Sequence, residues 1–451
     1  MKKTPRTNEE LISSFYETSF DPIQPYVLFG NFVFPSSFLQ RILFGFILVT
    51  ALGCGNDEEE VLVQNPTIDD TTLSMQNSLA KINIRLESSV LENLTKESYV
   101  DAQLSIGYWN GHEALESNIE IRGRGNSTWG FPKRPFQIRF PDKVEVLGLP
   151  KDKKWILLAN YTDKSMLRNE LGFSFGELSQ LEWTPENRFV DLYFNDDFHG
   201  TYQIIQKVEE SKNRVDIGED GYLLEIDQLS GLEPDDVYVR TDKNLYNIKE
   251  PELQNGSEAY EYIQNYLNQM EEAIWSEDFL DPELGYQKYL DIDSMVDWYL
   301  INEISRNTDS KFFTSVFLHK KRGEKIKMGP LWDFDLAFGN VDYNDNHMTG
   351  GFFLKNEGWM VRLFEDPVFV EKVKERFLHF YTHKEELKNL VQQRAITLQD
   401  SQTRNYEKWE TLGRYVWPNY VYFDTYEEEV DYLMDWVDDR FEWLNGAFEE
   451  L

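Results

Sequence analysis

The stretch 330-PLWDFDLAFGN-340 decides how the middle of this chain must fold. It places two carboxylates, Asp333 and Asp335, in a run that is otherwise rich in tryptophan, phenylalanine and leucine. Burying an unpaired charge costs several kcal/mol or forces the group to take up a proton. An apolar run that carries two carboxylates therefore needs something nearby that compensates their charge.

Composition limits the classes of function. The chain has 451 residues, of which 41% are hydrophobic and 15% aromatic, so most of it is expected to fold around a sizeable core. Its formal net charge is -35, whereas a protein that binds nucleic acid needs a basic surface. The composition therefore argues against a nucleic-acid partner. It fits a soluble surface, a basic partner or bound divalent cations.

The only cysteine, Cys54, follows a short apolar segment. One cysteine can form neither an intrachain disulfide nor a cysteine-based zinc site. The run 41-RILFGFILVTALGC-54 has one arginine and an apolar stretch too short to span a bilayer, which indicates an export signal. Its end, Ala51 to Cys54, resembles a bacterial lipobox, in which the cysteine is acylated and becomes the new N-terminus. The alternative is a buried helix that happens to contain a cysteine.

The residues around Cys54 also predict a location. The acidic run 56-NDEEE-60 resembles the surface-export tag of lipoproteins in Bacteroidetes-type bacteria. Residues 1–54 are predicted to be a signal peptide, whose long beginning suggests a start codon assigned too far upstream, and residues 55–75 an acidic linker. We therefore expect an exported lipoprotein, anchored through its lipid at the outer membrane or cell surface of a Gram-negative, Bacteroidetes-like bacterium.

Residues 76–451 are predicted to form one domain of the α+β class. Alternating apolar and polar residues, typical of strands, dominate residues 76–255. Helical periodicity dominates residues 256–451. A predicted strand pair, residues 312–321 and 325–332, interrupts this helical half.

The predicted strand pair brings a third carboxylate toward the first two. A turn at residues 322–323 puts Asp333 opposite Phe312, so that Asp309 lies about three residues, roughly 10 Å, away across the ladder. The order of helix, loop aspartate, strand pair and Asp-x-Asp is also that of a protein-kinase active site. Carboxylates that share a divalent cation have their charge compensated, so we predict a metal site at Asp333 and Asp335. The alternative is an acidic hairpin end covered by solvent.

A basic cluster stands out in the segment 122-RGRGNSTWGFPKRPFQIRF-140. It contains Arg124, Lys133 and Arg139, and the glycines on either side of Arg124 would allow the backbone to approach a phosphate closely. The segment matches neither a Walker A sequence nor the GxGxxG spacing. A phosphate-binding loop and an ordinary strand–turn–strand therefore remain alternatives.

Several motifs occur together along the chain. In chain order they are 121-IRGRGNSTW-129, 133-KRPFQIRF-140, 154-KWILLANYTDKSMLRNELG-172, 198-FHGTYQIIQKVE-209, 221-GYLLEID-227, 247-NIKEP-251 and 329-GPLWDFDLAFGN-340. Together they resemble the CotH kinase family, named for a spore coat protein, over roughly residues 75–451. The resemblance implies an atypical secreted kinase of distantly kinase-like fold. Such a kinase would use ATP with Mg²⁺ or Mn²⁺ to phosphorylate Ser or Thr of an exported protein.

The resemblance also implies roles for individual residues. Asp309 matches the loop aspartate that acts on the acceptor hydroxyl, and Asp333, with its neighbour Asp335, matches the metal-binding aspartate. The residues that would contact the nucleotide are Lys133, Arg124, Arg139, Lys154, Lys249 and Glu225. For Asp163 and Arg168, in the same motif as Lys154, a salt-bridged structural pair is the simpler interpretation.

Two positions depart from the family pattern. Many relatives have Glu where this chain has Gln206, and an amide cannot supply that charge, although Glu209 or Glu225 could. Relatives with a polar loop have Asn where this chain has Thr314, whose hydroxyl is a shorter metal ligand. These departures put catalysis in doubt.

Two other classes of function therefore stay open. One is a catalytically degenerate surface binding or adhesion module, for which 12 Trp and 24 Tyr would suit a glycan or protein surface. The other is a glycosidase with Asp309 and Asp333 as acid and base. The basic cluster and the Asp-x-Asp motif argue against the glycosidase.

We predict that the mature protein begins at a lipid-modified Cys54. Mass spectrometry of the membrane-extracted protein should find a diacylglyceryl group on Cys54 and no peptide from residues 1–53. A soluble product that keeps residues 41–53 would contradict this prediction.

Overall fold

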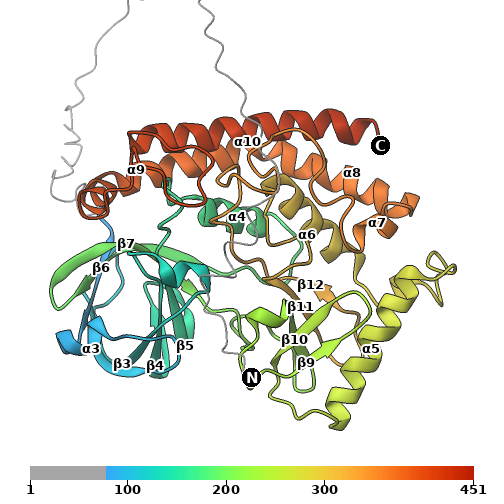
Figure 1. Ribbon diagram of the computed structural model, residues 1–451, viewed down its shortest axis with the longest axis horizontal. Helices are drawn as coiled ribbons and strands as arrows, with labels where there is room; N and C mark the ends of the chain where they lie inside the picture. The colour runs from blue at the N-terminus through green and yellow to red at the C-terminus, as the bar shows by residue number, and fades with distance from the viewer. Residues whose placement is uncertain (1–77) are drawn as a thin grey trace, which may run out of the picture. The chain divides into compact units, whose positions relative to one another are not determined.

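A closed seven-stranded barrel forms the first part of the chain (Figure 1). The structure, a computed structural model, describes residues 78–451, so the predicted signal peptide, Cys54 and the acidic linker lie outside the described residues. The strands follow the order β1-β2-β3-β4-β5-β7-β6, and parallel pairing of β1 with β6 closes the barrel. Their bounds are β1 Ala80–Arg85, β2 Val100–Ile106, β3 Leu115–Gly123, β4 Phe136–Val146, β5 Leu149–Leu158, β6 Asn187–Phe194 and β7 Asp197–Gln206.

The alternating pattern of the sequence explains most of the barrel. One side chain in two points inward, and these residues fill the barrel with a core of their own, to which Ile82, Ile121 and Ile138 belong. The sequence pattern does not indicate strand β5, because the four charged residues 151–154 interrupt its apolar residues. Only its pairing with β4 and β7 identifies it as a strand.

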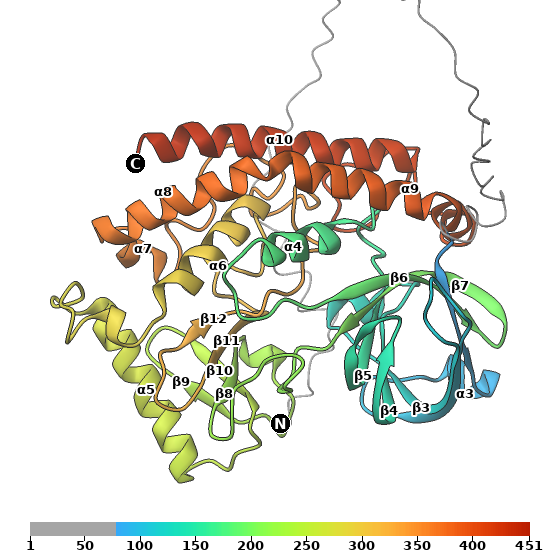
Figure 2. The same ribbon diagram turned by 180° about the vertical axis from the view of Figure 1, so that it is seen from behind.

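A second, antiparallel sheet has the order β12-β11-β8-β10-β9. Its strands are β8 Tyr222–Ile226, β9 Tyr238–Arg240, β10 Leu245–Glu250, β11 Val316–Lys320 and β12 Lys327–Met328. Strands from both halves of the sequence therefore share one sheet, because β11 pairs with β8. Both views show the barrel and this sheet side by side (Figures 1 and 2).

The predicted strand pair forms, but it is shorter than its sequence pattern suggests. The pairing of Leu318 with Met328 differs by one residue from the predicted register. The backbone of Phe312, Ser315 and Asp333 has φ of 54°, 56° and 55°, in the left-handed region. Strand geometry cannot continue through such residues, so the ladder ends and the flanking segments become loops.

Helices flank the barrel and the second sheet. Their bounds are α3 Ser88–Glu92, α4 Arg168–Glu177, α5 Glu258–Trp275, α6 Ile292–Ser305, α7 Met360–Leu363, α8 Pro367–Thr382, α9 Lys384–Lys408 and α10 Tyr426–Glu449. Helices α8, α9 and α10 run along the top edge in Figure 1, and α9 contacts the barrel through β7. The predicted α+β class, with a β-rich first half and a mainly helical second half, is confirmed. No helix in residues 78–451 is long and apolar enough to cross a membrane.

Helix α6 is the buried centre of the second half. Asp291 caps its first turn by accepting a hydrogen bond from Ser294 N, and almost every later residue is buried. It ends at Arg306, whose φ of 48° turns the chain toward the loop that carries Asp309. Because α6 is buried along almost its whole length, the loop that follows it starts from a fixed position in the core.

A buried ion pair ties α6 to α10. Arg440 Nη2 donates to Glu303 Oε1 at 2.6 Å, and both side chains are fully buried. The same carboxylate accepts hydrogen bonds from the backbone N of Phe353 and Leu354, at 2.5 and 2.8 Å. This pair therefore also fixes the chain that follows the Asp-x-Asp motif.

We predict that Arg440→Met lowers the free energy of unfolding by about 3–5 kcal/mol, because it leaves the Glu303 carboxylate buried without its counter-charge. Urea denaturation would measure the change. The double variant Glu303→Gln/Arg440→Met should recover part of the loss. Arg414→Met removes an equally close but exposed pair with Glu410, and should change stability little. A loss in Arg440→Met no larger than in Arg414→Met would contradict the prediction.

Candidate active site

A cavity of about 780 Å³ lies between the barrel, the second sheet and the segment that carries Asp333. Its volume falls within the range of about 300–1,000 Å³ that is usual for small-molecule sites. The predicted site residues that line it are Asp309, Asp333, Asp335, Arg124, Lys133, Lys249 and Glu225. The tertiary structure therefore brings together residues that are more than two hundred positions apart in sequence.

The carboxylates that line this cavity include the three predicted to be catalytic or metal-binding. Asp309 follows α6, and Asp333 and Asp335 follow β12. Each of the three residues is half-buried, with protein atoms packed around its carboxylate. Burial raises the pKa of Asp309 to about 7, with a contribution from the charge of Asp333. Burial and the charges of Asp333 and Asp309 raise the pKa of Asp335 to about 8. The protein around Asp309 and Asp335 thus disfavours their charged forms, which a bound cation would favour.

Phe334 explains how two carboxylates stand in an apolar run. Its ring lies so close to Gly172 of α4 that a Cβ there would be 2.2 Å from the ring, and its backbone N donates to Asn169 Oδ1 at 2.9 Å. The left-handed backbone of Asp333, with φ of 55°, turns the aspartates away from this contact. Ser315 Oγ then donates to Asp333 Oδ2 at 3.0 Å. The apolar residues are therefore anchored in the core while the carboxylates line the cavity.

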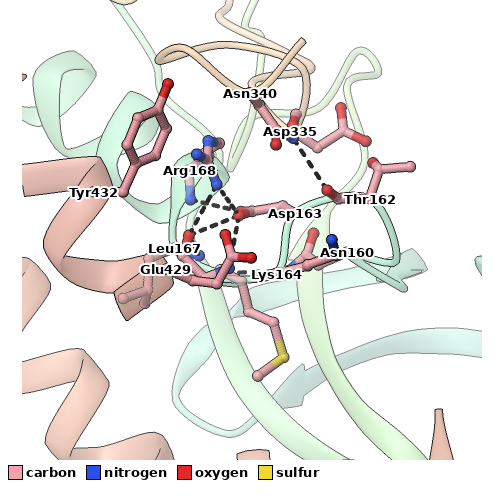
Figure 3. A network of polar contacts seen from close by, with 12 residues as sticks. Asn160, Thr162, Asp163, Lys164, Leu167, Arg168, Asp335, Asn340, Glu429 and Tyr432 are labelled. Atoms are coloured by element: carbon pink, nitrogen blue, oxygen red, sulfur yellow. Dashed lines mark hydrogen bonds and ion pairs between the residues drawn. The ribbon is translucent and has the colours of Figure 1, made fainter. Parts of the chain in front are cut away.

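A buried polar network holds the backbone of the Asp-x-Asp segment in place (Figure 3). Asn340 Nδ2 donates to the backbone O of Asp335 at 2.6 Å and of Thr162 at 3.2 Å. Next to Thr162, Asp163 Oδ1 accepts from Arg168 Nη1 at 2.6 Å, and both side chains are buried. The interpretation of Asp163 and Arg168 as a structural salt bridge is confirmed.

Arg124 is the cation that faces the carboxylates. It lies on the loop after β3, with its guanidinium carbon 5.3 Å from the centre of the Trp332 ring. Burial lowers its pKa, whereas the charges of Asp333 and Glu225 raise it. Within residues 78–451 its guanidinium forms no hydrogen bond or ion pair. It can therefore bind an anionic ligand without breaking a contact.

The loop that carries Arg124 forms part of the cavity wall, and its glycines leave the backbone accessible there. Gly125 has φ of 89°, and a Cβ there would lie 2.0 Å from Thr128 Oγ1, so the loop needs a glycine at this position. Residues 123–128 all line the cavity. This arrangement fits the expectation that backbone groups lie beside a phosphate.

Two lysine–carboxylate pairs complete the polar wall. Lys249 Nζ is 3.3 Å from Glu225 Oε2, and Lys207 Nζ is 3.3 Å from Glu209 Oε2. Burial raises the pKa of Glu225 to about 7, although Lys249 opposes the shift. Gln206 is fully buried and accepts a hydrogen bond from Glu186 N, outside the cavity lining. Of the two glutamates that could replace the charge missing at position 206, Glu225 lines the cavity, whereas Glu209 lies outside the lining and pairs with Arg214.

Three of the proposed nucleotide contacts have other partners. Lys133 touches the cavity, but its Nζ donates to Thr201 O at 2.5 Å and its side chain is almost fully buried. Arg139 and Lys154 do not line the cavity: Arg139 pairs with Glu120 at 2.6 Å, and Lys154 pairs with Glu209 at 3.1 Å.

The positions of Arg139 and Lys154 along their strands explain why the cavity does not include them. They are register partners on β4 and β5. Each lies one side-chain repeat beyond a residue that lines the cavity, namely Gln137 on β4 and Ile156 on β5. A step of two residues along a strand, about 7 Å, is enough to carry a side chain past the cavity edge.

The cavity also contains a carboxylate that was not predicted from the sequence. Asp227 lines the cavity and accepts hydrogen bonds from Thr314 Oγ1 at 2.8 Å and from Gln228 N at 2.7 Å. Its position two residues after Glu225, directly after the end of β8, was a usable signal, because residues two apart in an extended chain share a face. The hydroxyl of Thr314 is therefore already engaged with a carboxylate.

The cavity does not form a complete metal cage. Within residues 78–451, no three His, Cys, Asp or Glu side chains are grouped closely enough to hold a metal ion. Mg²⁺ in nucleotide sites is commonly held by one or two carboxylates together with substrate phosphates. The uncompensated carboxylates Asp333 and Asp335, with Arg124 opposite, fit a cation that binds together with a phosphate.

We predict that the metal-free protein loses stability as pH rises from about 4 to about 8. Asp309 and Asp335 have folded-state pKa values of about 7 and about 8, whereas an unfolded aspartate has about 3.9. Between these values the folded protein binds more protons than the unfolded chain, so the free energy of unfolding decreases with pH.

Thermal melting in a chelator would measure this effect, expected as several degrees. Other carboxylates also titrate here, so the decisive comparison is with Asp335→Asn, which should flatten the decline while matching the parent near pH 4. Parallel curves for the two proteins would refute the prediction.

The comparison with known families agrees with these observations. The family model described as CotH kinase protein matches residues 121–444, which include the cavity residues from Arg122 to Trp417. No curated protein is significantly similar to the chain. Because the family match covers most of its length, the chain belongs to the CotH kinase family.

Proposed function

We propose that this protein is an atypical kinase that transfers the γ-phosphate of ATP, bound with Mg²⁺ or Mn²⁺, to Ser or Thr of an exported protein. Membership of the CotH family supports a kinase-like function in general. The single observation that carries the finer proposal is the unpaired Arg124 guanidinium, which faces Asp333 and Asp335 across one cavity. Separated charges of this kind suit a phosphate and a cation that bind between them.

The phosphates would lie against the loop of residues 123–128. Arg124 would donate charge-assisted hydrogen bonds to phosphate oxygens, and the backbone beside it allows close approach. Lys249 and Lys207, each oriented by a carboxylate, lie in the same wall. A lysine held by a glutamate is a recurrent phosphate contact in protein kinases.

Asp333 and Asp335 would hold the divalent cation. When bound, the cation neutralises the charge of the phosphate oxygens, which is the usual contribution of metal in phosphoryl transfer. It would also remove the repulsion that raises the pKa of Asp335. Ser315, which donates to Asp333 Oδ2, would orient that carboxylate so that its other oxygen faces the cation.

Asp309 would position the acceptor and receive its proton. The hydroxyl oxygen of Ser or Thr forms a bond to the γ-phosphorus, and the bond from that phosphorus to the bridging oxygen breaks, so that ADP leaves. The hydroxyl proton passes to the Asp309 carboxylate. The pKa of about 7 makes Asp309 a better base near neutral pH than an ordinary aspartate.

The acceptor and the location rest on the sequence. The lipobox-like segment that ends at Cys54 supports an exported protein held at the membrane through lipid. The acceptor would then be another exported or surface protein. The net charge of -35 supports the expectation that nucleic acid is not a partner.

We predict that Asp309→Asn and Arg124→Ala fail in different ways. Asp309→Asn should keep ATP and metal binding but lose about a hundredfold or more of the transfer rate, because only the group that handles the proton has changed. Arg124→Ala should weaken ATP binding by about 1.5–3 kcal/mol, roughly tenfold or more. Calorimetry with ATP and Mn²⁺, and transfer of radiolabelled phosphate to membrane extracts, would measure the two effects.

Arg139→Ala is the matched control, because this arginine lies just beyond the cavity and pairs with Glu120. It should change neither ATP affinity nor transfer. Absence of ATP binding in the parent protein would refute the proposed function. Full transfer activity in Asp309→Asn would refute the role of Asp309.

A further inference from the structure

Four exposed aromatic rings lie within eight consecutive residues near the C-terminus. We call them the aromatic rim: Tyr415, Trp417, Tyr420 and Tyr422, which are 52%, 56%, 47% and 45% exposed. The other exposed large hydrophobic residues among positions 78–451 include no comparable group of aromatics. Apolar surface concentrated in this way usually marks a binding site.

The exposed side chains of this segment are aromatic rather than aliphatic. The aliphatic residues in the same segment, Val416 and Val421, are only partly exposed, and Pro418 is buried. The segment thus presents rings outward and turns its aliphatic groups inward. The outward surface consists of flat rings, of which three carry a hydroxyl.

The chain that leaves the candidate active site holds the rim in place. Asp342 N donates to Pro418 O at 3.1 Å, and Tyr420 N donates to Asn340 O at 2.9 Å. The ring of Tyr420 stacks on His347, with the ring centres 4.0 Å apart. A surface fixed by its backbone loses little freedom when it binds, so these contacts prepare the rim for a ligand.

The cations around the rings already have partners. The Tyr415 hydroxyl lies beside the Asp342 carboxylate, and burial together with the charge of that carboxylate raises the pKa of Tyr415. Arg414 is 2.8 Å from Glu410, and Lys164 donates to Arg414 O while its ammonium lies 5.0 Å from the Tyr422 ring. An anionic ligand would find no unpaired cation here, whereas the exposed Asp342 carboxylate can accept hydrogen bonds from a ligand. The rim therefore fits an uncharged ligand that carries many hydrogen-bond donors.

We propose that the aromatic rim binds an uncharged saccharide chain. Sugar rings present apolar C–H faces, which can stack on Tyr and Trp, and hydroxyl edges, which can donate to carboxylate and tyrosine oxygens. Asp342 and the hydroxyl of Tyr415 provide such acceptors at the edge of the rings. This binding site is separate from the proposed phosphate transfer and does not depend on it.

The rim also adjoins the cavity. Trp417 and Pro418 belong to the cavity wall, as do Asp309 and Phe313. Phe313, in the lining of the same cavity, is itself 54% exposed. A saccharide on the rim would therefore hold a glycosylated partner, or the glycan surface of a cell, next to the candidate active site.

The test uses the full-length protein and a panel of linear hexasaccharides: cellohexaose, mannohexaose and maltohexaose. Calorimetry and tryptophan fluorescence should detect binding of at least one of them. In Trp417→Ala/Tyr420→Ala the dissociation constant should rise about tenfold or more, because two stacked rings are lost. Trp417→Phe should retain most of the affinity.

Tyr108→Ala is the matched control, since Tyr108 is 69% exposed on the barrel side and lies outside the rim. It should bind as the parent does. Tyr415→Ala/Tyr420→Ala, which changes rings that do not line the cavity, should also bind poorly, and this separates the rim from any effect on the cavity. Thermal melting would show that each variant is folded.

Three outcomes would overturn the proposal. The first is that none of the three saccharides binds. The second is that one binds with equal affinity to the double variants. The third is that the rim instead prefers hexa-arginine, phosphatidylcholine vesicles or a second copy of the chain, as measured by calorimetry, co-sedimentation and ultracentrifugation. In this third outcome, the preferred partner would show which other class of ligand the rim binds. Because the readout is binding alone, failure here would leave the proposed kinase activity untouched, and the reverse also holds.

Discussion

The contact of Phe334 with helix α4 is the constraint on which the candidate active site depends. The ring fills the space above Gly172, and Asn169 holds the backbone N of the same residue at 2.9 Å. Because the ring and the backbone of Phe334 are both fixed, the aspartates on either side of it point into the cavity. A hydrophobic anchor thus places charges that would not take up this position by themselves.

Such an arrangement stores unfavourable energy in the metal-free protein. Asp309 and Asp335 repel Asp333, and Asp333 itself lies in a backbone region that side chains rarely adopt. The surrounding structure offsets this strain in part through buried ion pairs, Asp163 with Arg168 and Glu303 with Arg440. Strain held by rigid surroundings is common at functional sites, because it prepares the site for its ligand.

Much of the site could be read from the sequence because its signals are local. The spacing of Asp333 and Asp335 and their distance from Asp309 through a two-residue turn follow from strand geometry. Lys133, Arg139 and Lys154 show where this reasoning stops. Their charge and family position suggested a phosphate, yet Lys133 is bonded to Thr201 and the other two lie one side-chain repeat past the cavity. A sequence motif shows which residues are close together in the chain, but it does not show which residue each side chain contacts in the folded protein.

The sequence by itself determined the α+β class, the family and the strand pair that leads to the Asp-x-Asp motif, since each depends on periodicity or on residues close together in the chain. Only the tertiary structure decided that β5 is a strand of a closed barrel, that Asp227 joins the carboxylates, and that an unpaired Arg124 faces them. Those features depend on contacts between segments that are well separated in sequence, 87 residues apart for Thr314 and Asp227. Such contacts are chosen by packing and by the balance of buried charge across the whole domain, and no short stretch of sequence contains that balance.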